Sequence, residues 1–158
     1  MKQEQIRDFT RRIAQCNRAG MVVILYDMEF AYLQDACEAF NREDHQAWLQ
    51  ALSHADSVLV RLQKDLNFEY EMSKDLYALY RFCREELAKM RIRNTTAQME
   101  DVREVLHNLY DGFVAAAEQD HTPPLMRNTQ QVYAGMTYGR HDLTESFQDP
   151  ESSRGFFA

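Results

Sequence analysis

Apolar residues recur at alternating spacings of three and four through most of the first 120 residues of this chain. This spacing gathers them on one face of an α-helix, and such a face is buried against other helices. The pattern predicts helices over residues 43 to 67, 70 to 93 and 96 to 118. The three stripes are Trp48, Leu52, Ala55, Leu59, Leu62 and Leu66; Met72, Leu76, Leu79, Cys83, Leu87 and Met90; and Met99, Val102, Leu106, Leu109, Phe113 and Ala116.

Proline is absent from this periodic region, since Pro123, Pro124 and Pro150 all lie after residue 120. We therefore expect an all-α chain: an antiparallel up-down four-helix bundle over residues 1–120, followed by an irregular, mobile or extended tail over residues 121–158. The tail carries aromatic side chains, which solvating linkers usually lack. We expect it to fold back on the bundle and compete with whatever binds there. These aromatic residues are Tyr133, Tyr138, Phe147, Phe156 and Phe157.

The first helical region is the least regular. Asn17 is a favourable N-cap for a helix that runs to Phe40, which leaves residues 5 to 16 either as a separate helical piece or as a continuation of the same helix. Gly20 disfavours a continuous helix because glycine has a low helix propensity. Both alternatives remain open at this point.

Two further helix starts are predicted from capping residues. Asn41 is expected to cap the second helix, with Glu43 and Asp44 in the first turn, where the helix dipole favours negative charge. Thr95 and Gln98 have the spacing of a capping box, which predicts that the last helix begins there. Such short connections make successive helices antiparallel neighbours.

Charge and composition favour a protein partner. The formal net charge of −7 argues against nucleic-acid binding, which depends on clustered Lys and Arg. No apolar run is long enough to cross a membrane, and the first residues do not resemble a secretory signal, so we expect a cytoplasmic protein with no membrane partner. Cys16, Cys37 and Cys83 form no close pair, which argues against a disulfide framework and a thiolate zinc site.

Two other classes of helical bundle have sequence requirements that this chain meets only in part. A di-metal centre needs two Glu-x-x-His motifs, and only Glu104-x-x-His107 is present. A phosphorelay histidine would be His54, but the residues that follow it, Asp56 and Ser57, do not match the Lys-Gly expected there. We therefore expect no enzyme, no cofactor and no metal. A helical metal-binding enzyme or an adaptor is kept as an alternative.

Six consecutive apolar or amphipathic residues, Met21 to Tyr26, form the most unusual segment. In a helix they point around the whole circumference, so a bundle core can accept only some of them. Neighbouring helices, the N-terminal segment or the tail could cover the remainder. The alternative is a hydrophobic groove for an amphipathic segment of a partner protein.

The sequence motifs in and after this segment resemble those of the flagellar secretion chaperone family FliS. Leu25-Tyr26-Asp27 is similar to the end of the family's L-V-x-M-L-Y-D signature. Further similarities follow in the same order along residues 13 to 118. They are Leu66-Asn67-Phe68-Glu69, Leu76 to Phe82, Glu100 to Leu106, and Leu109 to Phe113.

The resemblance implies a flagellar export chaperone. Its partners would be the disordered C-terminal segment of flagellin, which it would keep from polymerising, and a component of the export apparatus. A chaperone for another secreted flagellar protein is the alternative. Asp27 could instead make a structural bond between helices. The flagellin-binding residues expected from the resemblance are Met21, Ile24, Leu25, Tyr26, Asp27, Tyr77 and Tyr80, with the two tyrosines of the third helix expected to face outward.

The chain also departs from the family pattern in three respects. The proline that precedes the first signature is absent from Gln15 to Val22, and the double glycine expected after Tyr70 is missing. The family's N-terminal tyrosine has only Phe9 near its place, which leaves N-terminal masking of a groove open.

Overall fold

A computed structural model describes residues 3–126, and within that range the chain forms five α-helices and no strand. The prediction of an all-α chain is confirmed. The described residues belong to one compact unit, Met1–Arg127. They hold a fifth helix because the N-terminal residues form a separate helical piece, one of the two alternatives above. The helices are α1 (Gln3–Gln15), α2 (Arg18–Asn41), α3 (His45–Lys64), α4 (Met72–Arg93) and α5 (Met99–Gln119).

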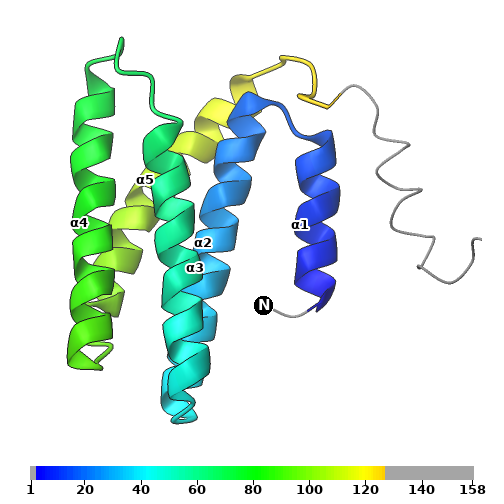
Figure 1. Ribbon diagram of the computed structural model, residues 1–158. Helices are drawn as coiled ribbons and strands as arrows, with labels where there is room; N and C mark the ends of the chain where they lie inside the picture. The colour runs from blue at the N-terminus through cyan, green and yellow to red at the C-terminus, as the bar shows by residue number, and fades with distance from the viewer. Residues whose placement is uncertain (1–2, 127–158) are drawn as a thin grey trace, which may run out of the picture. The chain divides into compact units, whose positions relative to one another are not determined.

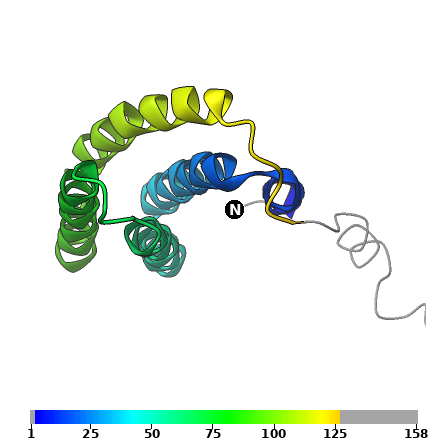
Figure 2. The ribbon, with the colours of Figure 1, turned by 90° about the horizontal axis from the view of Figure 1, so that it is seen from above.

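Successive helices of this unit run in opposite directions, as the colour gradient of Figure 1 shows. Helix α2 is central: it packs against α1, α3 and α5, while α4 packs against α3 and α5. Seen from above, α5 passes along α2 from the end of α4 towards α1 (Figure 2). A helix with three neighbours can bury apolar residues on most of its surface, which explains the apolar run in α2.

The junction between α1 and α2 is closed by Asn17. Its Oδ1 accepts a hydrogen bond from the backbone N–H of Gly20 at 2.8 Å, so Asn17 caps α2 as predicted. Its Nδ2 donates to the carbonyl oxygen of Asp120 at 2.9 Å. A Cβ atom on Gly20 would lie 3.0 Å from that same Oδ1, so the absence of a side chain at position 20 leaves room for the cap.

Two predicted helix starts are wrong. Asn41 is the last residue of α2, and Asp44 caps α3 instead by accepting from the N–H of Ala47 at 3.0 Å. The capping box at Thr95 and Gln98 does not form, since α5 begins at Met99 with no side-chain cap. The Thr95 hydroxyl accepts from Ala97 instead. Short polar side chains compete for nearby backbone groups, and spacing alone does not decide which of them wins.

The core lies between α2, α3, α4 and α5. Trp48, Leu59 and Leu106 are among its fully buried side chains, in agreement with the predicted stripes. The stripe of α4 begins differently, because Met72 is exposed and Ser73 is buried, with its hydroxyl donating to the carbonyl of Asn67 at 2.6 Å.

The residues after α5 form no helix as far as residue 126, as expected for the start of the tail. Leu125 nonetheless donates its backbone N–H to the carbonyl oxygen of Cys16 at 2.9 Å, so this segment is held at the α1–α2 junction. The rest of the predicted tail, with its five aromatic residues, lies outside the described residues.

Candidate functional site

The apolar run of α2 is shared between the core and the neighbouring helices. Ile24 and Tyr26 are buried, whereas Met21, Val22, Val23 and Leu25 are half-buried. Because α1, α3 and α5 all pack against α2, these neighbouring helices cover much of the run. The first alternative of the sequence analysis, coverage by neighbouring segments, therefore describes this structure.

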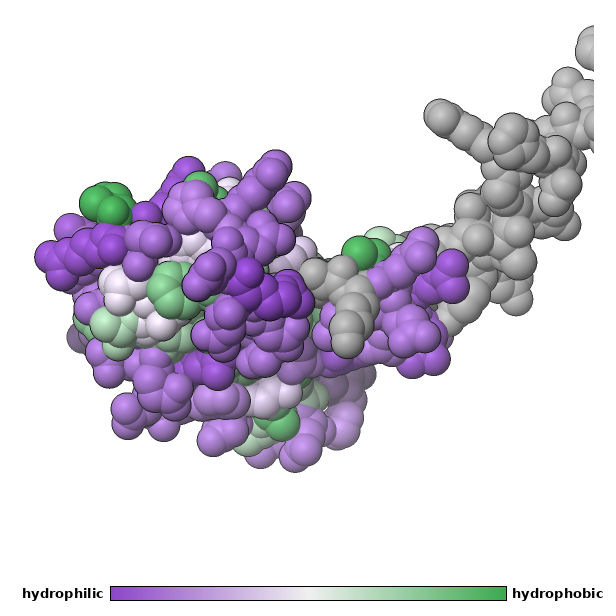
Figure 3. All heavy atoms as spheres, turned by 90° about the horizontal axis from the view of Figure 1, so that it is seen from below, coloured by the Kyte–Doolittle hydropathy of each residue, from purple (hydrophilic) through white to green (hydrophobic). Residues whose placement is uncertain are grey.

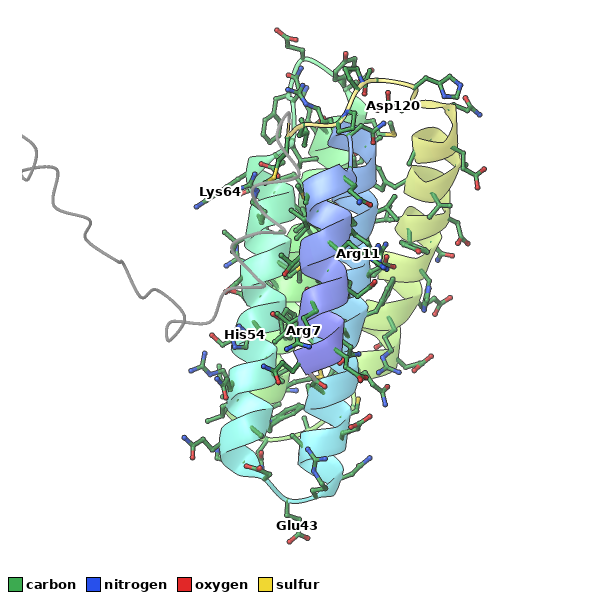
Figure 4. All side chains as sticks on the ribbon, turned by 90° about the vertical axis from the view of Figure 1, so that its right-hand side faces the viewer. Arg7, Arg11, Glu43, His54, Lys64 and Asp120 are labelled. Atoms are coloured by element: carbon green, nitrogen blue, oxygen red, sulfur yellow. The ribbon has the colours of Figure 1, made fainter. Side chains whose placement is uncertain are left out.

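Helix α1 covers α2 only loosely. Among its described side chains Ala14 alone is buried, Phe9 and Ile13 are half-buried, and Ile6 is 49% exposed. Within residues 3–126, α2 is the one helix whose backbone packs against α1. Figure 4 shows α1 lying in front of α2, with α3 on one side and α5 on the other. An amphipathic helix therefore occupies the α2 surface with little burial of its own.

An ion pair between described residues joins the two helices. The guanidinium of Arg12 in α1 donates to the carboxylate of Asp27 in α2, and it also lies 5.7 Å from the ring centre of Phe9. Burial, together with the nearby Asp27 carboxylate, raises the pKa of Tyr110 in α5. Asp27 thus makes a bond between helices, the structural role considered for it. Nothing in the sequence distinguished its partner, Arg12, from the other arginines.

A shallow groove of about 400 Å³ lies where α1, α2 and α5 meet. Apolar side chains of α2 and α5 form much of it, including Val23, Ile24 and Val114. Arg12 and Glu118 lie at its sides. The groove suits an apolar side chain of a peptide, and it continues the surface that α1 covers.

Tyr26 and Tyr80 meet in the core. Their phenolic oxygens are 2.7 Å apart, and their exposed fractions are 0% and 1%. The expectation that Tyr80 faces outward is wrong, because α4 turns this side chain towards α2, where it finds the hydrogen-bond partner that a buried phenol needs. Neither tyrosine has a surface that a client could contact while the core stays packed.

Tyr77 lies elsewhere. It is 43% exposed on α4, and its ring centre is 5.9 Å from that of Phe68 in the α3–α4 connection. It is therefore separate from the α2 residues with which the sequence analysis grouped it. Ile24 and Asp27 lie on adjoining faces of α2, and Arg12 of α1 joins them through its ion pair with Asp27. Leu25, two residues before Asp27, points to the opposite side of the helix and packs against the core.

The core also holds a carboxyl group that the sequence analysis missed. Glu29 of α2 is completely buried, and neither carboxyl oxygen has a hydrogen-bond partner in the described residues. Burial, with a smaller contribution from Asp56, raises the pKa of this carboxyl well above its usual value. Burial also raises the pKa of the nearby Cys83 thiol to about 12. The position of Glu29 within the predicted helix was the one available signal.

The Glu104-x-x-His107 motif is not part of a metal-binding group among the described residues. His107 stacks on Phe30, with ring centres 4.3 Å apart. Across residues 3–126, no three His, Cys, Asp or Glu side chains gather in a group able to hold a metal ion.

Over the same range, no helix combines the length and the apolar character needed to cross a membrane. Figure 3 shows a mostly hydrophilic end of the unit with small, separate hydrophobic patches.

Comparison with known protein families agrees with this helical arrangement. A family model described as "Flagellar protein FliS" matches residues 1–120. The chain belongs to the FliS family. FliS proteins are flagellar export chaperones, so a flagellar protein is the expected kind of partner. The match extends from α1 to the end of α5 and thus includes all five helices. Comparison with individual curated proteins finds no match.

Proposed function

We propose that this FliS protein binds the disordered C-terminal segment of flagellin in the cytoplasm, prevents its premature polymerisation and delivers it to the export apparatus. The binding surface would be the face of α2 that α1 covers, with Ile24 and Asp27 in it and Met21 beside it, while Leu25 would lie on the side that packs against the core. Tyr26 and Tyr80 would support that face from the core, and Tyr77 would lie outside it.

The observation that carries the proposal is the weak attachment of α1. The amphipathic helix α1, 13 residues long, lies against the helix that carries the apolar run of residues 21–26, yet among its described side chains Ala14 alone is buried. A client segment that becomes helical on binding could take the same position and bury more apolar area. The groove at Val23, Ile24 and Val114 would then receive one of its apolar side chains.

Calorimetric titration with a flagellin C-terminal peptide tests this proposal. Binding is expected for the full chain, and Val23→Lys should weaken it because a charge would enter the apolar groove. The matched control is Val60→Lys, which places the same charge on a half-buried valine of α3. Circular dichroism checks that both variants stay helical.

Three results would contradict the proposal. They are an absence of binding heat at several temperatures, equal weakening by both lysine variants, and a full loss of affinity in the Val60→Lys variant alone. The last result would place the client on α3 instead of the covered face of α2.

A further inference from the structure

A second concave surface lies between α3 and α4, away from the face that α1 covers. It encloses about 560 Å³, and all of its lining residues come from these two helices. Unlike the groove beside α1, it is lined by several arginines. We call it the α3–α4 groove; Asp56 and Gln63 lie on its α3 wall, and Tyr77, Arg81, Arg84 and Arg91 on its α4 wall.

The α4 wall has helical spacing of its own. Tyr77, Arg81, Arg84, Ala88 and Arg91 are separated by four, three, four and three residues, and all five line the groove. They form a stripe next to the core stripe of the same helix. From Tyr77 to Arg91 the stripe is roughly 21 Å long, which matches a partner helix of about 14 residues.

The guanidinium groups of this stripe are set up to receive carboxylates. Arg84 is fixed by Asp56, at 2.6 and 3.4 Å, and by the side-chain oxygen of Gln63 at 3.0 Å. Arg81 uses its Nε for Glu85 at 2.8 Å, which leaves both terminal nitrogens without a bond inside residues 3–126. Arg91 makes no ion pair with any described residue. Guanidinium groups bind carboxylates through two parallel hydrogen bonds.

One end of the groove is aromatic. Tyr77 and Phe68 contact each other there, with exposed fractions of 43% and 54%. Tyr70 and Met72 are exposed in the same part of the chain, at 67% and 68%. Large exposed aromatic side chains beside arginines are the residue types that dominate binding energy at protein interfaces.

The charge of the groove is opposite to that of the protein. A chain with a net charge of −7 repels acidic partners in general, yet this groove offers three guanidinium groups against the carboxylates of Asp56 and Glu85. We propose that the α3–α4 groove binds an acidic amphipathic helix of a partner protein. Its carboxylates would lie against Arg81 and Arg91, and an apolar side chain at one end would lie against Tyr77 and Phe68.

A synthetic peptide of about 14 residues tests the proposal, with glutamates spaced to face the arginines and one terminal leucine. Its affinity for the full chain is measured by fluorescence anisotropy at low salt. Replacing its glutamates by glutamine should weaken binding by about tenfold or more, and Arg91→Gln in the protein by about threefold to fivefold. The matched control is Arg93→Gln, an exposed arginine two residues further along α4, which should change affinity by less than about twofold.

A charge exchange makes the test specific. A peptide with lysines in place of glutamates should bind the Arg81→Glu, Arg91→Glu double variant better than it binds the unchanged protein. Equal binding of glutamate and glutamine peptides, or equal effects of Arg91→Gln and Arg93→Gln, would overturn the proposal. Since Val23→Lys should leave this peptide's affinity unchanged, failure here is distinct from failure of the flagellin proposal.

Discussion

The hydroxyl groups of Tyr26 and Tyr80 form a hydrogen bond of 2.7 Å in the buried centre of the unit. It joins α2 to α4, two helices whose backbones are not close neighbours. The ring of Tyr26 also lies 5.5 Å from that of Phe113, so this one side chain connects α2 with α5 as well. Tyr26, the tyrosine of the motif that resembles the FliS signature, therefore stabilises the fold.

Replacing either tyrosine by phenylalanine should lower the free energy of unfolding by about 1 to 2 kcal/mol, because the remaining hydroxyl loses its buried partner. The double variant should lose less than the sum of the two single variants, since no hydroxyl is then left unpaired. Urea denaturation followed by the fluorescence of Trp48, the one tryptophan of the sequence, measures this. Tyr70→Phe, at an exposed site, is the control, and additive losses would argue against a coupled pair.

Glu29 should make stability depend on pH. Its pKa is higher in the folded protein than the ordinary value of 4.5, so the folded state keeps a proton that the unfolded state releases. The stabilisation is complete below pH 4.5 and is lost as the pH rises towards the raised pKa. Glu29→Gln should flatten this decline, whereas Glu38→Gln, at an exposed site of the same helix, should not. Parallel pH profiles for the three proteins would refute the assignment.

Removing the Glu29 carboxyl altogether should stabilise the fold at neutral pH. Glu29→Met keeps a side chain of similar length and leaves no unpaired oxygen in the core, so we expect a gain of about 1 to 3 kcal/mol. Thermal unfolding at pH 7 measures it. A lower midpoint in the variant would mean that the carboxyl has a partner that stabilises the native state.

The Arg12–Asp27 ion pair should help to hold α1 in place. Both side chains are partly exposed, so its contribution is about 1 kcal/mol at most. Arg12→Gln and Asp27→Asn should each speed amide hydrogen exchange in α1, by up to about fivefold, while exchange in α3 stays unchanged. Arg11→Gln is the control because the partner of Arg11, Asp8, belongs to α1 itself. If α1 competes with the client, Arg12→Gln should also bind flagellin peptide more tightly, because Arg12 belongs to α1 and not to the proposed surface of α2.

The Asn17 side chain makes two hydrogen bonds, one that caps α2 and one to the carbonyl of Asp120 at the end of α5, and their effects can be separated by substitution. Asn17→Ala should destabilise the protein by about 1 to 2 kcal/mol through loss of the α2 cap. Asn17→Asp keeps the oxygen that caps Gly20 but places a carboxylate oxygen against the carbonyl of Asp120, so it should chiefly loosen the end of α5. Hydrogen exchange resolved by segment distinguishes the two. An equal effect of both variants on α2 and α5 would contradict this division.

The periodic apolar residues were enough to predict most of the fold. The stripe from Trp48 to Leu62 is buried as expected, because burial of a helix face follows directly from spacing. Met72 and Ala116 were assigned to stripes and are exposed; Met72 is the first residue of α4, and Ala116 stands in the last turn of α5. The helix ends themselves depended on local hydrogen bonds, such as that of Asp44, which spacing does not specify.

The candidate site was less predictable. The apolar run in α2 indicated that another segment must cover it. The sequence did not specify that this segment is α1, because the packing of one helix on another depends on the tertiary structure. Phe9 and Ile13 of α1 are half-buried in the folded chain. Tyr80 and Tyr77 are three residues apart, yet Tyr80 is buried against Tyr26 of α2, whereas Tyr77 is 43% exposed in the wall of the α3–α4 groove. Resemblance to a family motif assigned both tyrosines to one binding site, whereas the packing of α4 places them in different environments.

The three-sided burial of α2 also sets an order of events during protein synthesis. Its partners α1 and α3 are adjacent in sequence, but its third partner, α5, ends at Gln119. Chains are made from the N-terminus, so α2 must wait on the ribosome with one apolar side uncovered until nearly the whole domain has emerged. The nascent protein is thus itself exposed to aggregation for most of its synthesis, and the last helix to appear ends that exposure.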